Sequence, residues 1–465
     1  MQNITLIIAI VGSVLALVLQ PAYALATYVA MLLWYPDYLR VSIGTIDLSV
    51  GRIIVTVLLI RCLFNNNLRR AFVWQTIDTW VALMMAVLVG VYCITNNTFS
   101  AALENRGGLL IDTWFAYLAA RLVITDKDVL IRFIKVTSLV IAPLAVHGIV
   151  EATTGWQPFL QLIRFRQWRP REIEAGDMLA TQLRWGLTRA VGPFSHPIMF
   201  GNCFVMFLPL IWVLRHQRGL WGKLAYLLSG MVILGAISSM SSGPWGMLVI
   251  VVLCLILEKY KHWLKPILVT LAILCILLVI GSKKPYHKLL SLANLGQGDW
   301  YSRARLIDAA IDNIDEWWLA GYGGKDPGWG SREGGYFWCN FTDVNNEFIL
   351  VGVEVGMSGV IALCVVLIMA FRMLSQASRQ TENIELKALY WSLGSTLVGV
   401  IAAWQGVCFF GQMNALFYSI LGIIGSSVAF TKKLEFSNQP LSTDNIRYQY
   451  PARNNMMYLF DGMRK

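Results

Sequence analysis

Long apolar runs separated by short polar connections dominate this sequence. They fall near residues 4–19, 21–35, 49–64, 74–94, 109–124, 129–150, 198–214, 224–238, 244–257, 266–281, 345–371, 388–405 and 412–430. A helix that crosses a bilayer needs about 20 apolar residues. Backbone groups in lipid must be hydrogen-bonded within the segment, which favours helices over strands. The pattern predicts an all-α polytopic membrane protein with about twelve transmembrane helices.

Two long polar connections divide the chain. We expect N-terminal transmembrane helices (1–150), a first long loop (151–197), central helices (198–281), a larger loop (282–344), C-terminal helices (345–430) and a polar tail (431–465). The spacing of Ile307, Ile311, Ile314 and Trp318 predicts an amphipathic helix in the larger loop. Such a helix would lie on the membrane surface or cap a cavity.

Composition agrees with this architecture. Of 465 residues, 57% are apolar and only 14% are charged, against roughly 25% charged in soluble domains. This argues against a soluble enzyme, a disordered chain and a disulfide scaffold. The net charge of +11 comes from basic residues in alternate connections, beginning with Arg61, Arg69 and Arg70. Because basic loops stay in the cytoplasm, we expect both long loops outside and the C-terminus inside.

Two further expectations follow from the same pattern. No basic run is interleaved with aromatic residues, so we expect no nucleic-acid partner. At the N-terminus, the two first runs meet at Pro21. If both cross, the N-terminus lies outside; we favour one re-entrant run and an inside N-terminus.

The clearest candidate site begins at Arg189, where the first long loop enters a helix. Its neighbour His196 lies among two prolines and two glycines, which shape an irregular helix start. An arginine at this depth can simply snorkel to the surface. Irregular backbone here also suits a cavity.

The second candidate closes the larger loop, where Asp343, Asn346, Glu347 and Glu354 share roughly one helix face. Asp343 could alternatively be only a helix cap. A charge within a span is costly, so we expect Glu354 to face protein or water.

Other loop residues add cations and aromatic faces. Arg303 and Arg305, with Arg184 and Arg189, could form an arginine cluster suited to phosphate. The hydroxyl-rich turn at 238–246 is either a tight turn or an anion nest at a helix start. Trp300 and Tyr322 could stack on sugar rings, or belong to an interfacial aromatic belt.

Together these groups suit one reaction. If the donor is a sugar on a lipid pyrophosphate, cations stabilise the departing pyrophosphate, and a carboxylate or His takes the acceptor hydroxyl's proton. We see no metal-binding pair in the outer loops and no nucleotide motif. We therefore expect no metal and no cofactor.

At these stretches the sequence resembles the O-antigen ligase and Wzy-type polysaccharide polymerase superfamily. Three features carry the resemblance: RAVGPFSHPIMFG at 189–201, SSMSSGPWG at 238–246, and a long loop that ends in VNNEFILVGVEVGMSG. The first is similar to that family's Arg-x-x-Gly-x-Phe helix start, and the last to its His-Asn…Glu-x-Gly-x-x-Gly. The overall layout of helices and loops is also similar.

The resemblance implies a metal-independent, inverting glycosyltransferase of the bacterial inner membrane. It would take glycan from undecaprenyl pyrophosphate on the periplasmic side, possible partners being a chain-length regulator or export complex. Arg189 matches the family's pyrophosphate-binding arginine, and Arg303 and Arg305 match its loop arginines less closely.

Asn345 falls where ligases have their proposed catalytic His. This departure favours polymerisation of an exopolysaccharide, capsule or O-antigen over transfer to lipid A-core or protein. The base would then be Asp343 or Glu347, with His196 behind them, and Asn346 would contact glycan. A transporter on the same scaffold is the alternative from another class.

Overall fold

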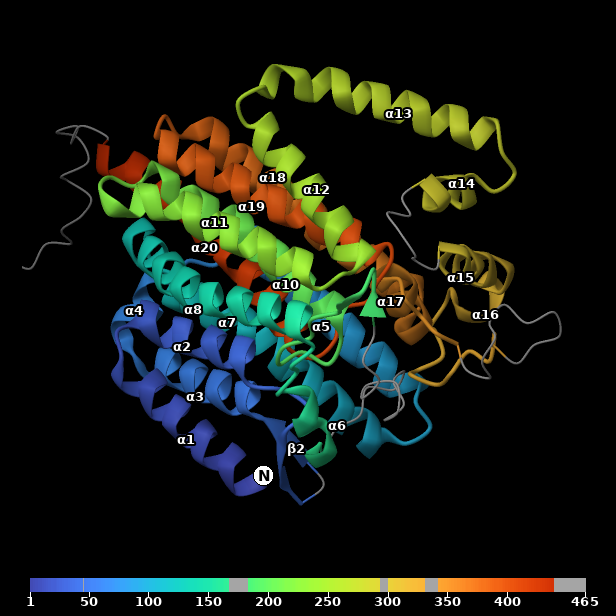
Figure 1. Cartoon of the computed structure of the whole chain (residues 1–465), viewed down its shortest axis with the longest axis horizontal. Helices are drawn as coiled ribbons and strands as arrows, with labels where there is room; N and C mark the ends of the chain where they lie inside the picture. The colour runs from blue at the N-terminus through green and yellow to red at the C-terminus, as the bar shows by residue number, and fades with distance from the viewer. Residues whose placement is uncertain (45, 167–182, 293–299, 331–341, 439–465) are drawn as a thin grey trace, which may run out of the picture.

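The computed structural model describes residues 1–44, 46–166, 183–292, 300–330 and 342–438. It is almost entirely helical, with two small antiparallel hairpins in the described part (Figure 1). The first half contains α1 (Gln2–Val18), α2 (Pro21–Trp34), β1 (Arg40–Ile43), β2 (Ile46–Ser49), α3 (Val50–Phe64), α4 (Asn66–Ala71), α5 (Thr76–Thr95), α6 (Phe99–Leu110), the π-helical turn η1 (Ile111–Phe115), α7 (Ala116–Val123), α8 (Lys127–Thr154), the 3-10 turn η2 (Leu160–Phe165), β3 (Leu183–Arg184) and β4 (Leu187–Thr188).

The second half continues with α10 (Pro197–Val213), η3 (Leu214–His216), α11 (Leu220–Ser238), α12 (Ser242–Leu257), η4 (Lys261–Trp263), α13 (Leu264–Ile280), α14 (Pro285–Leu292), α15 (Trp300–Asp312), α16 (Ile314–Trp317), α17 (Glu347–Val355), α18 (Met357–Gln380), α19 (Ile384–Trp404) and α20 (Gln412–Asn438). Most of these helices pack side by side into one bundle, and α13 lies apart from it (Figure 1).

Local sequence explains where several helices begin and end. Asp126 caps α8, its Oδ1 accepting from the backbone N–H of Val129 at 2.9 Å. Gly155, with φ of 72°, ends that helix in the left-handed region. Pro197 opens α10, where its missing N–H costs no intrahelical hydrogen bond.

Eight helices of the described chain are long and apolar enough to cross a membrane. They are α5, α8, α10 with its following turn, α11, α13 with its preceding turn, α18, α19 and the first part of α20. Three more, α1, α2 and α12, are apolar but shorter. The structure therefore agrees with the expected all-α membrane protein, but it does not confirm the expected number of about twelve spans.

The N-terminal helices form a hairpin, which differs from the arrangement that the sequence favoured. Pro21 starts α2 after a sharp turn, and α2 runs back along α1. The hydroxyls of Thr5 and Tyr35 are 2.7 Å apart, and the Gln2 amide donates to Ser42 at 3.5 Å. The N-terminus thus lies at the end of the bundle that carries the β1–β2 hairpin, the same end as the loops expected outside (Figure 1).

Two connections contain more structure than expected. The connection between the predicted runs 74–94 and 109–124 contains most of α6, which continues through η1 into α7. The expected run 345–371 is two helices, because Gly356, with φ of 78°, separates α17 from α18. A Cβ at Gly356 would lie 2.7 Å from backbone atoms of Leu319 and Ala320, so only glycine fits this crossing.

The predicted amphipathic helix of the larger loop is interrupted. It ends at Asp312, and a separate short helix, α16, follows. The face that packs inward carries Leu306, Ala309, Ala310 and Trp317. Ile311, Ile314 and Trp318 are exposed. Three of the four residues of the predicted stripe are therefore exposed instead of packing against the protein.

Candidate functional site

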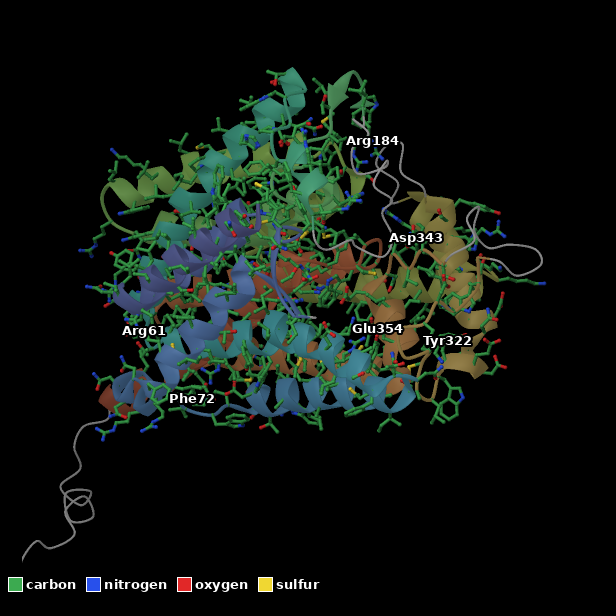
Figure 2. The ribbon with its side chains drawn as sticks, turned by 90° about the horizontal axis from the view of Figure 1, so that it is seen from below. Arg61, Phe72, Arg184, Tyr322, Asp343 and Glu354 are labelled. Carbon is green, nitrogen blue, oxygen red and sulfur yellow. The ribbon has the colours of Figure 1, made fainter. Side chains whose placement is uncertain are left out.

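A cavity of about 550 Å³ lies where α6, α17 and the segment that follows Phe410 meet. Its wall carries four basic and four acidic side chains: Arg40, Arg52, Arg106, Lys325, Asp112, Asp326, Glu347 and Glu354. Apolar residues complete it, among them Met84, Leu88 and Leu363. Figure 2 shows Glu354 and Asp343 toward one end of the bundle, and Arg61 and Phe72 toward the opposite end.

Glu347 is the first residue of α17 and forms part of the wall of this cavity. Its Oε2 accepts a hydrogen bond from the backbone N–H of Phe409 at 2.9 Å. Burial raises the pKa of Glu347 to about 8; the charge of Glu354 adds to the rise, and the Phe409 N–H opposes it. A carboxyl group with this pKa exchanges a proton near neutral pH, as a general acid or base must.

The cationic side chains are held by specific partners. Arg52 binds Asp112 with two parallel hydrogen bonds, Nε to Oδ1 at 2.9 Å and Nη2 to Oδ2 at 2.5 Å. Asp112 lies in the π-helical turn η1, a local distortion that is frequent at functional sites. Arg106 is 2% exposed; its Nη2 lies 2.9 Å from Oε2 of Glu354 and its guanidinium carbon 3.4 Å from the ring centre of Tyr92.

A second cationic group lies at the β3–β4 hairpin: Arg184 is in β3, and Arg189 directly follows β4. Arg189 donates from Nη2 to Oγ of Ser241 at 2.8 Å, and Arg184 donates from Nη1 to the carbonyl of Met240 at 3.4 Å. Burial, with a smaller contribution from the neighbouring charge of Arg184, lowers the pKa of Arg189 to about 10. Both arginines remain cationic at neutral pH. The turn at 238–246 therefore meets the arginines through Met240 and Ser241.

His196 belongs to this second group but is a neutral helix cap at physiological pH. Its Nδ1 accepts from the backbone N–H of Ile198 at 3.1 Å. Burial lowers the pKa of His196 to about 3, with the charges of Arg189 and Arg184 contributing. A ring with so low a pKa is a weak base, and in this structure His196 caps the start of α10.

Glu151, a fully buried residue of α8, holds the backbone that carries the second group. Its Oε2 accepts from the N–H groups of Val191 and Gly192 at 2.8 and 2.9 Å. Its Oε1 lies 3.0 Å from Nε2 of His147. Gly192 has φ of 55°, and a Cβ there would lie 2.6 Å from Phe200. This support fixes the loop that begins at Arg189.

The remaining predicted carboxylate and amide lie beside the cavity. Thr342 and Val344 belong to its wall, whereas Asp343 between them is partly buried and does not. Asn346 caps α17, because its Oδ1 accepts from the N–H groups of Phe348 and Ile349. Its Nδ2 also donates to the carbonyl of Gln405 at 3.3 Å. Both the oxygen and the nitrogen of the Asn346 amide are therefore hydrogen-bonded within the protein.

The predicted loop residues are distributed around α15 and α16. Arg303 packs against Gly406, where an added Cβ would lie 2.8 Å from Nη1. The guanidinium carbon of Arg305 lies 5.6 Å from the ring centre of Tyr301. Tyr322 donates its hydroxyl to Glu316 at 2.8 Å. The side chain of Trp300 lies outside the described part of the structure.

The structure thus separates the predicted residues into neighbouring groups. Glu347 lies in the cavity wall, whereas Arg184 in β3, Arg189 and His196 lie close enough together to interact electrostatically. The amide of Gln412, the residue after Gly411 of the cavity wall, donates to the carbonyl of Pro193 at 3.4 Å and connects the two groups.

Sequence reasoning missed the cations that share the cavity with Glu347, namely Arg40, Arg52, Arg106 and Lys325. A usable signal was present, because Arg52 and Asp112 each interrupt an apolar run. Among the described residues, no three His, Cys, Asp or Glu side chains gather as metal ligands would. No known protein family matches this chain, and no curated protein matches it.

Proposed function

We propose that the protein is a membrane glycosyltransferase that polymerises undecaprenyl-pyrophosphate-linked oligosaccharide repeats on the periplasmic side of the bacterial inner membrane. One observation carries the proposal. A carboxyl group with a pKa near 8, Glu347, lies in the wall of a cavity that also contains guanidinium groups. A base and cations in one cavity are what transfer from a pyrophosphate donor requires.

The proposed reaction is a single displacement with inversion. The acceptor hydroxyl oxygen attacks the anomeric carbon of the donor, and its proton passes to the Glu347 carboxylate. The bond from the anomeric carbon to the pyrophosphate oxygen breaks, and the pyrophosphate leaves with the electron pair. Arg40 and Arg106 are the cavity cations we assign to that developing charge. No step uses a metal or cofactor.

Polymerisation, rather than transfer to an unrelated acceptor, is supported by the second cationic group. In a polymerase both glycans are attached to a lipid pyrophosphate. Arg184 and Arg189 lie outside the cavity wall but are connected to it through Gln412. We assign these arginines to the second pyrophosphate, which retains the role that the sequence suggested for them.

The test uses purified protein in lipid nanodiscs with the host's lipid-pyrophosphate-linked repeat unit and no other acceptor. We expect a ladder of lengthened glycans that disappears in Glu347→Gln and persists in Asp343→Asn, the matched control beside the cavity. The reverse result would move the base to Asp343. Transfer only after lipid A-core or protein is added would make the protein a ligase. No transfer with a donor that a known enzyme accepts would favour a transporter.

A further inference from the structure

The tip of the β3–β4 hairpin has an unusual residue in its turn. Trp185 and Gly186 connect the strands with φ of 50° and 78°, the positive values that a type I′ turn requires. Gly, Asn and Asp adopt this conformation at little cost, whereas a bulky residue there is an outlier. A strained tryptophan is retained only where its surroundings stabilise it.

Trp245, in the first turn of α12, supplies those surroundings. The two indole rings stack with centroids 5.3 Å apart and planes 20° apart. The Trp245 Nε1 donates to the carbonyl of Ile237 at 3.2 Å, and this hydrogen bond fixes the Trp245 indole ring. Trp185 remains 56% exposed above it, and its neighbours Leu183 and Leu187 are also exposed. The hairpin therefore presents an apolar tip.

This tip continues the outward-facing stripe of α12. Trp245, Val249, Leu253 and Ile256 follow one another at spacings of 4, 4 and 3, so they share one helix face. The last three are more than half exposed. Exposed aliphatic residues on an apolar helix of a membrane protein face lipid. Trp185 thus covers the point where a lipid-facing stripe reaches the end of its helix, the depth at which tryptophan is enriched.

We propose that the β3–β4 hairpin is a membrane-interface anchor. Its tip, formed by Leu183, Trp185 and Leu187, rests in the interfacial region of the bilayer beside α12. Arg184 then lies at the level of the lipid headgroup phosphates, with its guanidinium steadied by the carbonyl of Met240. The partner is the phospholipid surface itself, and the anchor sets the depth of the second cationic group.

A bilayer suits this tip better than a sugar does. A sugar platform places hydrogen-bonding groups around the aromatic ring, whereas here aliphatic Leu183 and Leu187 flank it. The inference depends on the membrane location and does not require the proposed transferase activity. Its test can therefore fail while that activity is retained, or succeed without it.

The test places single cysteines at Trp185 or Leu183, labelled with an environment-sensitive fluorophore, in phospholipid nanodiscs. Glu104→Cys, at an exposed charged position of α6, is the matched control. The Leu183→Cys variant leaves the tryptophan stack intact. Unsubstituted protein, labelled in parallel, corrects for the native cysteines. Each sample is quenched with nitroxide-labelled phospholipid and, separately, with aqueous iodide.

We expect the lipid quencher to reduce emission at 183 and 185 several-fold more than at 104, and iodide to show the opposite order. Equal iodide quenching at all three positions, with no effect of the lipid quencher, would overturn the anchor. Protection from iodide only when the host polysaccharide is added would overturn it in favour of a glycan platform.

Discussion

At the scale of single residues, Glu347 makes the sharpest prediction, because its pKa is raised to about 8. A general base acts only when deprotonated, and at neutral pH most Glu347 carboxyls carry a proton. We expect the transfer rate to rise about tenfold per pH unit up to pH near 8 and then to level off. Initial rates of glycan lengthening across this range check it. A rate that is flat from mildly acidic to alkaline pH would exclude Glu347 as the base.

The same group predicts an effect on stability that needs no substrate. A carboxyl group whose pKa is raised in the folded state keeps its proton to a higher pH there than in the unfolded chain. The contribution of Glu347 to the free energy of unfolding is therefore lost as pH rises from the ordinary glutamate pKa range to about 8. We expect Glu347→Gln to remove this loss, so its melting temperature at pH above 8 should exceed that of the unsubstituted protein. Glu354→Gln serves as the comparison variant. A lower melting temperature for Glu347→Gln would contradict the raised pKa.

Arg303 can be tested without removing its charge, because Gly406 lies against it. A Cβ at 406 would be 2.8 Å from Nη1 of Arg303, so Gly406→Ala should displace the guanidinium. If Arg303 binds pyrophosphate, we expect a higher KM for the lipid-linked donor with an unchanged melting temperature. Gly394→Ala is the control, since nothing lies within 4 Å of its added carbon. Equal KM values for the two variants would remove Arg303 from the site.

At the scale of elements, a buried ion pair joins three helices near the end opposite the cavity. Asp78 of α5 accepts from Nε and Nη2 of Arg121 at 2.8 and 2.7 Å, and Tyr117 of α7 also donates to it. Arg121 further donates to Ser426 of α20 at 3.1 Å. Both ions are at most 4% exposed.

Removing one partner of this pair should destabilise the bundle strongly. Asp78→Asn leaves the Arg121 charge buried without its counter-ion, a change that costs about 3–5 kcal/mol in comparable cases. We expect a clearly lower melting temperature in nanodiscs. Glu382→Gln, at the exposed pair with Lys387, should leave it almost unchanged. Similar melting temperatures for both variants would show that the buried pair contributes little.

The helices were predictable because their signals are local. The run at 198–214 nearly coincides with α10, and Pro197 marks its start. The hairpins were missed, since strands of two to four residues have too few positions to show a period. The interruption after Asp312 was missed for another reason. Ile311 and Ile314 have helical spacing, but Ala309, Ala310 and Trp317 pack inward instead.

The candidate site was only partly predictable, because tertiary packing assembles it. The sequence pointed to Glu347 and Arg189 through their places at helix starts. Only the fold shows that Glu347 shares a cavity with Arg52 and Arg106, which lie far away in sequence. The role of Glu151 was equally hidden. Its hydrogen bonds reach residues 40 positions further along the chain.

At the scale of the whole molecule, the two ends of the bundle have different compositions. The cavity and the β3–β4 hairpin lie at one end, as Glu354 and Arg184 mark in Figure 2. Arg61 marks the other end, where the short basic connections lie. Short connections rich in Lys and Arg remain in the cytoplasm. The N-terminus lies at the cavity end, so the topology predicts that it and the cavity are on the periplasmic side together.

Thiol labelling in whole cells tests that topology directly. Asn3→Cys and Glu104→Cys place exposed thiols at the cavity end, and Asn66→Cys places one beside the basic residues that follow α3. We expect a membrane-impermeant maleimide to label residues 3 and 104 in intact cells, and residue 66 only after permeabilisation, because charged reagents do not cross the bilayer. Labelling of 104 without 3 would restore an inside N-terminus and contradict the α1–α2 hairpin. Labelling of residue 66 without residue 104 would show that the topology is inverted. The cavity would then lie on the cytoplasmic side, where it could not receive a periplasmic substrate.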